Sequence, residues 1–378
     1  MPNTYQIGRL GRVYVAQESS YGSAASLAAG DAVRHLNSKF NQSPRNRVNS
    51  PEKHQHPSQL YRFDRRKTAD WMLSGILYPS GTINTLPDAD PILKSTFGQV
   101  RNVTLSTTVN GSPTTTSVPC VSVTGLAVGD FILVNATNGG RQVRKITNIA
   151  STTLTVEPAL AAAPSVGNSV KGCITYSFTT ALGNSLNMAR YLPNVSYEIL
   201  GGAPESLKIM FDANDEIMFE ASGPAQSRSR PAQSDPGTFT VVGTTPPSGL
   251  TGFLRVNTAA EEFLKATFEI KNGIALDNRA FGTSAAQAMF RNTKREVLTT
   301  IDAMQSDDVS ILDVSETNAD TQGLVQCGLT EGSIVAVYAP KIDIETPDDQ
   351  DGDETLQHSF RGVCKGSSGN DELYLVFA

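Results

Sequence analysis

The feature that most constrains the fold is the regular recurrence of turn residues. They repeatedly end short runs of alternating apolar and polar residues. The clearest example is residues 205–222, ESLKIMFDANDEIMFEAS, which read as two matched strands around the turn DANDE. The 31 glycines and 20 prolines supply turns throughout the chain. We therefore predict a mainly β protein with one or two short helices.

Further segments fit this prediction. GRVYVAQ at the start of the chain and DELYLVFA at its end both read as strands. Helices are predicted over residues 65–81, with Trp71, Met72 and Leu77 on one broad apolar face, and over residues 87–98, with Asp90 as the N-cap. A helical turn is also predicted over residues 258–266. Periodicity is lost over residues 37–63, where three prolines oppose both helix and inner strand.

Composition changes between residues 101 and 173. Residues 101–170 contain two acids and one aromatic residue, and the runs PCVSVTG, DFILVNA, RQVRKITNIA and TTLTVEPAL read as short strands. We predict that residues 101–173 form a small inserted β-rich module. The main domain is then discontinuous and consists of residues 1–100 and 174–378.

Charge is distributed unevenly along the chain, although the formal net charge is only -6. Residues 34–67 contain nine Lys or Arg and two acids, whereas residues 302–354 contain fourteen acids and one base. Such asymmetry suggests an electrostatic partner. The two regions are either solvated faces that aid solubility, or surfaces that meet within a subunit or between copies.

Motifs that support chemistry are absent from the sequence. It contains no phosphate-binding loop, no GxSxG turn, no HExxH and no GxGxxG after a strand. The acid-rich residues 348–354 do not fit an EF-hand calcium loop. Aligning Gly352 with loop position 6 puts Pro347 at position 1 and His358 at position 12, where the loop needs oxygen ligands. His54 and His56 are interpreted as part of a solvent-facing or interface loop rather than as metal ligands. We predict no cofactor, no metal and no enzymatic activity.

The four cysteines are far apart and form no CxxC pair, so we expect them to be buried and reduced. The N-terminal sequence lacks an apolar secretory segment, and the chain has no 18-residue apolar run. We therefore expect neither secretion nor a membrane span.

Four stretches carry a family resemblance through their order along the chain. They are AQESSYGSAAS, ADPILKSTFG, the run FEIKNGIALDNRAFGTSAAQAMFRNTKREVLTTIDAM, and the C-terminal run from EGSIVAVYAPKIDIE to NDELYLVFA. Together they resemble the tail tube (major tail) proteins of long-tailed bacteriophages. The shared features are an E-x-x-Y-G start, an arginine followed by FGTS, and a terminal N-D-E-L strand. The resemblance covers residues 5–98 and 174–378 and leaves out the inserted module.

The resemblance implies a structural virion protein with a β-sandwich or β-barrel domain. Hexameric rings would stack into the tail tube, the conduit for DNA ejection into the host. Its partners would be copies of itself, the tape measure protein, and tail terminator or baseplate proteins, with double-stranded DNA passing through without specific binding. It would be made in the host cytoplasm, end in the virion, and have no contact with membrane. Pairing of open sheet edges around a ring would close a barrel of about 24 strands, wide enough for a DNA duplex.

Two sets of charged residues are the candidate contacts in such an assembly. We predict that one set bridges subunits or rings: Arg34, Lys39, Arg45, Arg47, Lys53 and Arg62. The other set would form an acidic strand-connecting turn at the lumen mouth or ring end: Asp348, Asp349, Asp351, Asp353 and Glu354. Acids there would let DNA slide, because basic contacts to phosphates favour binding. The alternative functions are a β-rich surface adhesin or carbohydrate-binding protein, and a hydrolase without a recognisable signature.

Overall fold

The computed structural model describes a mainly β chain, as predicted from the sequence. The described residues are 10–42, 47–49, 53, 58, 62–64, 66–136, 140–237, 245–256, 259–261, 263–279, 281–304, 310–317, 319–347 and 357–378. Within these ranges the helical elements are α1 (Asp90–Phe97), α2 (Ser310–Thr317) and the 3-10 turns η2 (Ala29–Asp31) and η3 (Gly249–Thr251). None of these helices is long and apolar enough to cross a membrane.

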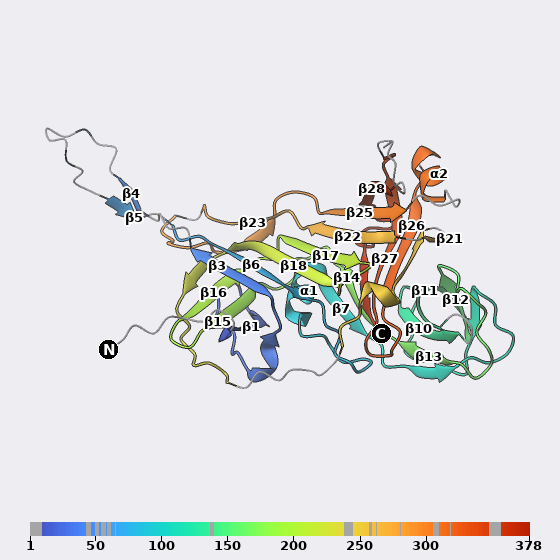
Figure 1. Cartoon of the computed structure of the whole chain (residues 1–378). Coiled ribbons are helices and arrows are strands. Elements are labelled where there is room, and N and C mark those ends of the chain that lie inside the picture. The colour runs from blue at the N-terminus through green and yellow to red at the C-terminus, as the bar shows by residue number, and fades with distance from the viewer. Residues whose placement is uncertain are drawn as a thin grey trace.

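The main body is built on a 14-stranded sheet (Figure 1). Its main path runs, in order of pairing, through β21 (Ala259–Glu261), β20 (Phe253–Val256), β26 (Thr321–Cys327), β27 (Val335–Ile344), β28 (Gln357–Cys364), β25 (Glu296–Met304), β22 (Phe263–Lys271), β17 (Ser206–Asp212), β18 (Met218–Ala225), β6 (Ala69–Ile76) and β3 (Asn37–Gln42). A branch adds β29 (Tyr374–Phe377), β14 (Ile174–Phe178) and β7 (Gly98–Asn102). The predicted hairpin around DANDE is confirmed as β17 and β18, and the predicted C-terminal strand as β29.

Strand β27 joins the two parts of this sheet. Its first half pairs with β29, from Val335 opposite Phe377, and its last residues pair with β28, from Ile342 opposite Cys364. Pro340 lies between the two paired runs, next to an irregularity in the ladder with β26. Proline has no N–H to donate, so a change of partner at this position leaves no donor unpaired.

A smaller sheet and helix α1 pack against the main sheet and close its core. The five-stranded sheet has the order β19 (Ser227–Ser229), β16 (Ser196–Gly202), β15 (Leu186–Tyr191), β1 (Arg12–Gln17) and β2 (Ala32–Val33). A single apolar cluster contains Val15 of β1, Trp71 of β6, Phe97 of α1 and Phe268 of β22. The two sheets and the helix therefore share one core.

Residues 106–172 form a separate six-stranded sheet. Its order is β8 (Ser106–Thr108), β13 (Ser169–Gly172), β10 (Phe131–Ala136), β11 (Gly140–Ala150), β12 (Thr153–Glu157) and β9 (Ser117–Pro119). One face has its own apolar cluster, including Ile132, Ile146 and Val156. The segment leaves and re-enters the main sheet through the adjacent strands β7 and β14, so its two connections lie side by side.

Two short ribbons complete the architecture. β23 (Ile274–Leu276) pairs with β24 (Met289–Arg291), and β4 (Arg47–Asn49) pairs with β5 (Arg62–Asp64). In Figure 1 the β4–β5 ribbon stands clear of the body, beyond the ends of β3 and β6. We call β4, β5 and the intervening residues the arm.

The helix predicted over residues 65–81 is wrong, because this segment contains strand β6. β6 is hydrogen-bonded to β3 on one side and to β18 on the other. Its buried residues alternate, with Trp71 and Leu73 in the core and Met72 and Ser74 on the opposite face. The cluster of large apolar residues suggested a helix, whereas pairing on both sides selects the two-residue period.

The helical turn predicted over residues 258–266 is also wrong, since β21 and β22 cover the described part of that segment. The helix predicted over residues 87–98 is confirmed as α1, although Asp90 is its first residue and Ala89 is the N-cap. Asp90 instead accepts a hydrogen bond from the Tyr176 hydroxyl, at 2.7 Å. Strand β3 and helix α2 were not predicted.

Candidate assembly surfaces

One face of the main sheet is buried and the other is polar, and this division follows from the alternation of side chains along each strand. On β22, Ala266, Phe268 and Ile270 are buried, whereas Thr267 and Glu269 point to the other side. β17 and β6 show the same pattern. An antiparallel sheet with one face on the core and one face toward solvent is stable in water. The polar face is therefore a continuous surface across neighbouring strands, interrupted by an apolar row in which Ile76, Met218 and Met210 are neighbours.

Charges on the polar face alternate in sign from strand to strand. Lys208 of β17 lies between Glu220 of β18 and Glu269 of β22 in the register of the sheet. A second row has the same alternation in the order Asp212, Lys265 and Asp302. Opposite charges at facing positions stabilise a sheet, and Lys208 and Lys265 each lie beside acids. The face therefore carries many charges but little net charge.

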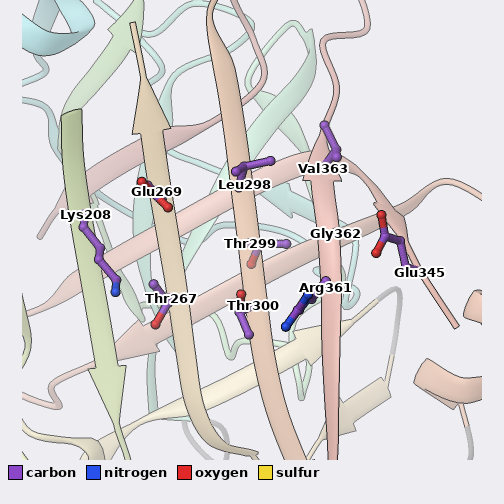
Figure 2. A pocket seen from close by; sticks show the side chains of 10 residues that line it. All are labelled: Lys208, Thr267, Glu269, Leu298, Thr299, Thr300, Glu345, Arg361, Gly362 and Val363. Atoms are coloured by element: carbon purple, nitrogen blue, oxygen red, sulfur yellow. The ribbon is translucent and has the colours of Figure 1, made fainter. Parts of the chain in front are cut away.

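A shallow depression of about 330 Å³ lies on this sheet near β28. Figure 2 shows Lys208, Thr267, Thr300 and Arg361 on four neighbouring strands, with Glu345 beside the last of them. Acids, bases and threonines line the depression together. It therefore has the same mixture of opposite charges as the surrounding face of the sheet. Among the described residues, no group of three His, Cys, Asp or Glu side chains is placed to hold a metal ion.

The basic candidates fall into two groups. Arg47 and Arg62 belong to the arm, at positions opposite Asp64 and Asn49, and Lys53 lies between its strands and is exposed. Arg45 lies outside the described residues.

The other two basic candidates lie on the body. Lys39 is exposed on β3, on the face opposite the buried Phe40. Arg34 pairs with Asp88 and stacks over the Tyr78 ring at 3.6 Å, and its side chain is only 12% exposed. The Arg34 side chain is thus occupied within its own subunit and has little surface left for a neighbour.

The acidic candidates Asp348, Asp349, Asp351, Asp353 and Glu354 all lie outside the described residues. They fall between the end of β27 at Ile344 and the start of β28 at Gln357, two strands that pair antiparallel. Their placement at a lumen mouth or ring end stays a prediction.

The E-x-x-Y-G stretch that contributes to the family resemblance has a structural role here. The buried Glu18 carboxylate accepts hydrogen bonds from the Gly22 N–H at 2.7 Å, the Ser185 hydroxyl at 2.5 Å and the Gly201 N–H at 2.8 Å. Burial raises the pKa of Glu18 above its ordinary value. Gly22 adopts φ +74, a left-handed conformation that suits glycine. Glu18 therefore ties the turn after β1 to β15 and β16.

A buried cation sits where the six-stranded sheet meets the body. Arg144 of β11 donates hydrogen bonds to the Val143 carbonyl at 2.7 Å and to the Ala159 carbonyl at 3.2 Å. Arg255 of β20 donates to the same Ala159 carbonyl at 2.7 Å. Burial, and then the nearby Arg255 charge, lower the pKa of Arg144 to about 9. These carbonyls compensate the buried guanidinium, so the cluster fixes one sheet to the other.

Two exposed apolar groups were missed by the sequence reasoning. Phe281 in the β23–β24 loop is fully exposed, and Leu250 on η3 is 80% exposed. Phe281 belongs to the RAFGTS stretch, which contributed to the family resemblance. Its exposure was not predicted, because sequence alone does not show which phenylalanines reach the surface.

No protein-family model matches the chain, and a search of curated proteins finds none with a similar sequence.

Proposed function

We propose that the chain is a structural subunit whose copies close into hexameric rings that stack into a bacteriophage tail tube. The observation that carries the proposal is the main sheet, which combines a broad polar face of balanced charge with an arm that leaves the body. A polar outer face is common in antiparallel sheets, so the arm is the feature that favours a subunit of a polymer over a protein that acts as a single chain. A subunit of a polymer uses both, one to line a channel and the other to reach a neighbour.

The polar face suits the wall of a channel for DNA. Each Lys or Arg that contacts a phosphate adds favourable binding, so a basic wall would retain DNA. On this face Lys208 and Lys265 each lie between two acids in the register of the sheet. The balanced pattern lets DNA pass without requiring a wall that is acidic throughout.

The edge of the sheet supports closure into a ring. Within the described part of the chain, β3 has a hydrogen-bonded strand partner, β6, on one side only. An open edge is a template for pairing with another chain, and head-to-tail contacts that return on themselves make rings. We therefore assign the β3 edge to a contact between neighbouring copies.

The arm supplies the second contact, and its bases give it a charge-dependent test. We expect the triple variant Arg45→Glu, Arg47→Glu and Arg62→Glu to remain folded and to form no tubes in negative-stain electron microscopy. The matched control replaces the same three residues by lysine, which keeps the charge and should keep the tubes.

Circular dichroism of both triple variants checks that the fold survives the substitutions. Tubes of normal length from the glutamate variant would refute the bridging role of the arm. Monomers of the unmodified protein at every concentration tested would refute the proposed function itself.

A further inference from the structure

A fully exposed phenylalanine marks the end of the body nearest the arm. Phe281 lies in the loop between β23 and β24 and has no contact that shields its ring from solvent. The loop is nevertheless anchored, because the Ser284 carbonyl accepts the Lys67 N–H at 2.9 Å and the Ala286 carbonyl accepts the Gln226 side-chain N–H at 2.7 Å. The body thus holds the C-terminal part of the loop at Ser284 and Ala286, while the Phe281 side chain is unburied.

Basic side chains surround this loop. Arg279 is 81% exposed and lies 3.6 Å from Asp277, a surface pair that contributes little. Lys67 is exposed beside the anchoring bond to Ser284. The arm-side end therefore presents an aromatic ring with a basic fringe.

The opposite end of the same strands presents exposed leucines. Leu250 on η3 is 80% exposed and Leu329 in the β26–β27 turn is 57% exposed. The two turns are linked, since the Gly328 N–H donates to the Thr251 hydroxyl at 3.2 Å. We call Leu250 and Leu329 the leucine patch.

Acidic side chains fringe the leucine patch. The Gly249 N–H donates to the Asp215 carbonyl at 3.1 Å, and Glu216 forms an isolated bridge with Ser248. Asp215 and Glu216 are both exposed in the β17–β18 turn. Arg141 also reaches the patch, because its guanidinium donates to the Leu329 carbonyl at 3.0 Å, so the acids lie on the Leu250 side of the patch and Arg141 lies on the Leu329 side. The Leu250 side therefore has the charge opposite to that of Arg279 and Lys67.

The register of the sheet places the two surfaces at opposite ends of the body. Ala225 of β18 pairs with Ala69 of β6 at the end that anchors the Phe281 loop. Met218 pairs with Ile76 at the other end, next to the turn that holds Leu250. Complementary surfaces at opposite ends of one subunit produce a head-to-tail contact that repeats from copy to copy.

We propose that the Phe281 loop of one copy docks on the leucine patch of a second copy, with Arg279 and Lys67 facing Asp215 and Glu216. The proposal rests on the proposed function and makes this contact, together with the arm, one that joins successive rings. It also gives the exposed Phe281 ring an apolar partner.

A double-cysteine variant tests the contact directly. We expect Phe281→Cys with Leu250→Cys, oxidised with copper phenanthroline, to give a covalent ladder extending beyond six chains on a non-reducing gel. The native cysteines are all buried and should give little background. The matched control pairs Phe281→Cys with Val166→Cys, a 64% exposed residue of the six-stranded sheet, and should give no ladder.

The outcomes separate this contact from the proposed function. Tubes without a ladder, or a ladder that stops at six chains, refute a contact between rings and leave the tube intact. A long ladder from filaments that are not hollow keeps the contact and refutes the tube. Monomers without crosslinks refute both.

Two substitutions measure the strength of the contact. We expect Phe281→Ser to raise the concentration needed for polymerisation on the order of tenfold to a hundredfold, because burial of one phenylalanine is lost. Val166→Ser should leave that concentration unchanged. Charge reversal at Arg279 and Lys67 should also impair polymerisation, and reversal of Asp215 and Glu216 in the same chain should restore it. Equal polymerisation by Phe281→Ser and the unmodified protein would overturn the proposal.

Discussion

Two segments leave the main body, and they are held in opposite ways. The six-stranded sheet has its own apolar cluster and shares a second cluster with the body, whereas the arm is a two-stranded ribbon that stands clear in Figure 1. Isolated two-stranded ribbons are marginally stable in water. The difference teaches that the inserted sheet is packed within a single chain, and under the proposed function the arm is completed by another chain.

The contact between the six-stranded sheet and the body is specific as well as apolar. Phe131 of β10 packs edge-on against Tyr338 of β27, with ring centroids 5.7 Å apart. The Gln326 side chain of β26 acts as a strand partner for β11, accepting the Val143 N–H at 2.8 Å and donating to the Arg141 carbonyl at 2.7 Å. The inserted sheet is therefore fixed in orientation.

The largest expected effect comes from removal of the arm. Replacing residues 47–64 by a short Gly-Ser linker would remove the arm and keep both the β3–β6 pairing and Lys67, whose N–H anchors the Phe281 loop. We expect the melting temperature of the monomer to stay within about 3 °C, since the shared core is untouched, and assembly to be lost completely. Light scattering and electron microscopy measure the assembly. A large loss of stability would mean that the arm is part of the fold, and the comparison would fail.

A smaller effect is expected in a thiol-labelling experiment. It compares how readily a thiol reagent reaches a cysteine in the arm and one in the six-stranded sheet. Burial raises the pKa of Cys120, in the inserted sheet, to about 11, from about 9 for an unburied thiol. At pH 8 this shift alone lowers the thiolate population about a hundredfold, and only the thiolate reacts. We expect Lys53→Cys in the arm to react with a thiol reagent at the rate of a free peptide thiol, and the native cysteines to react at least about a hundredfold more slowly. Fast reaction of Cys120 would show that the inserted sheet opens.

The smallest effect is expected at Gln326. Gln326→Ala leaves the Val143 N–H and the Arg141 carbonyl without their partner, and we expect the free energy of unfolding to fall by about 1–3 kcal/mol. The exposed Gln287 provides the control, and Gln287→Ala should change it by less than about 0.5 kcal/mol. Urea unfolding measures both. No change at Gln326 would show that the apolar packing and the Arg255 contact to Ala159 hold the two sheets together without it.

Sequence patterns predicted the elements whose signals are local. The turn DANDE between two alternating runs identified β17 and β18, and Pro91 near the start of a short apolar run identified α1. β6 could not be assigned in the same way, because its alternation of Trp71 and Leu73 with Met72 contains large apolar residues on both faces. Only pairing with β3 and β18, which lie far from it in the sequence or beyond a proline-rich stretch, selects the strand.

The candidate surfaces were predicted less completely than the fold. Clustering of bases along the chain pointed to the arm, and the structure places Arg47 and Arg62 in its two strands. The same clustering included Arg34, whose partner Asp88 is 54 residues away and was invisible in the sequence. The alternation of charge across β18, β17 and β22 depends on the register between strands, which composition does not contain.

The division of β27 between two partners has a mechanical consequence. Because one unbroken backbone is bonded to β29 on one side of Pro340 and to β28 on the other, tension on either half of the sheet is carried to the other half through covalent bonds. In the proposed tube, force applied to either half of the sheet would therefore reach the other half through β27.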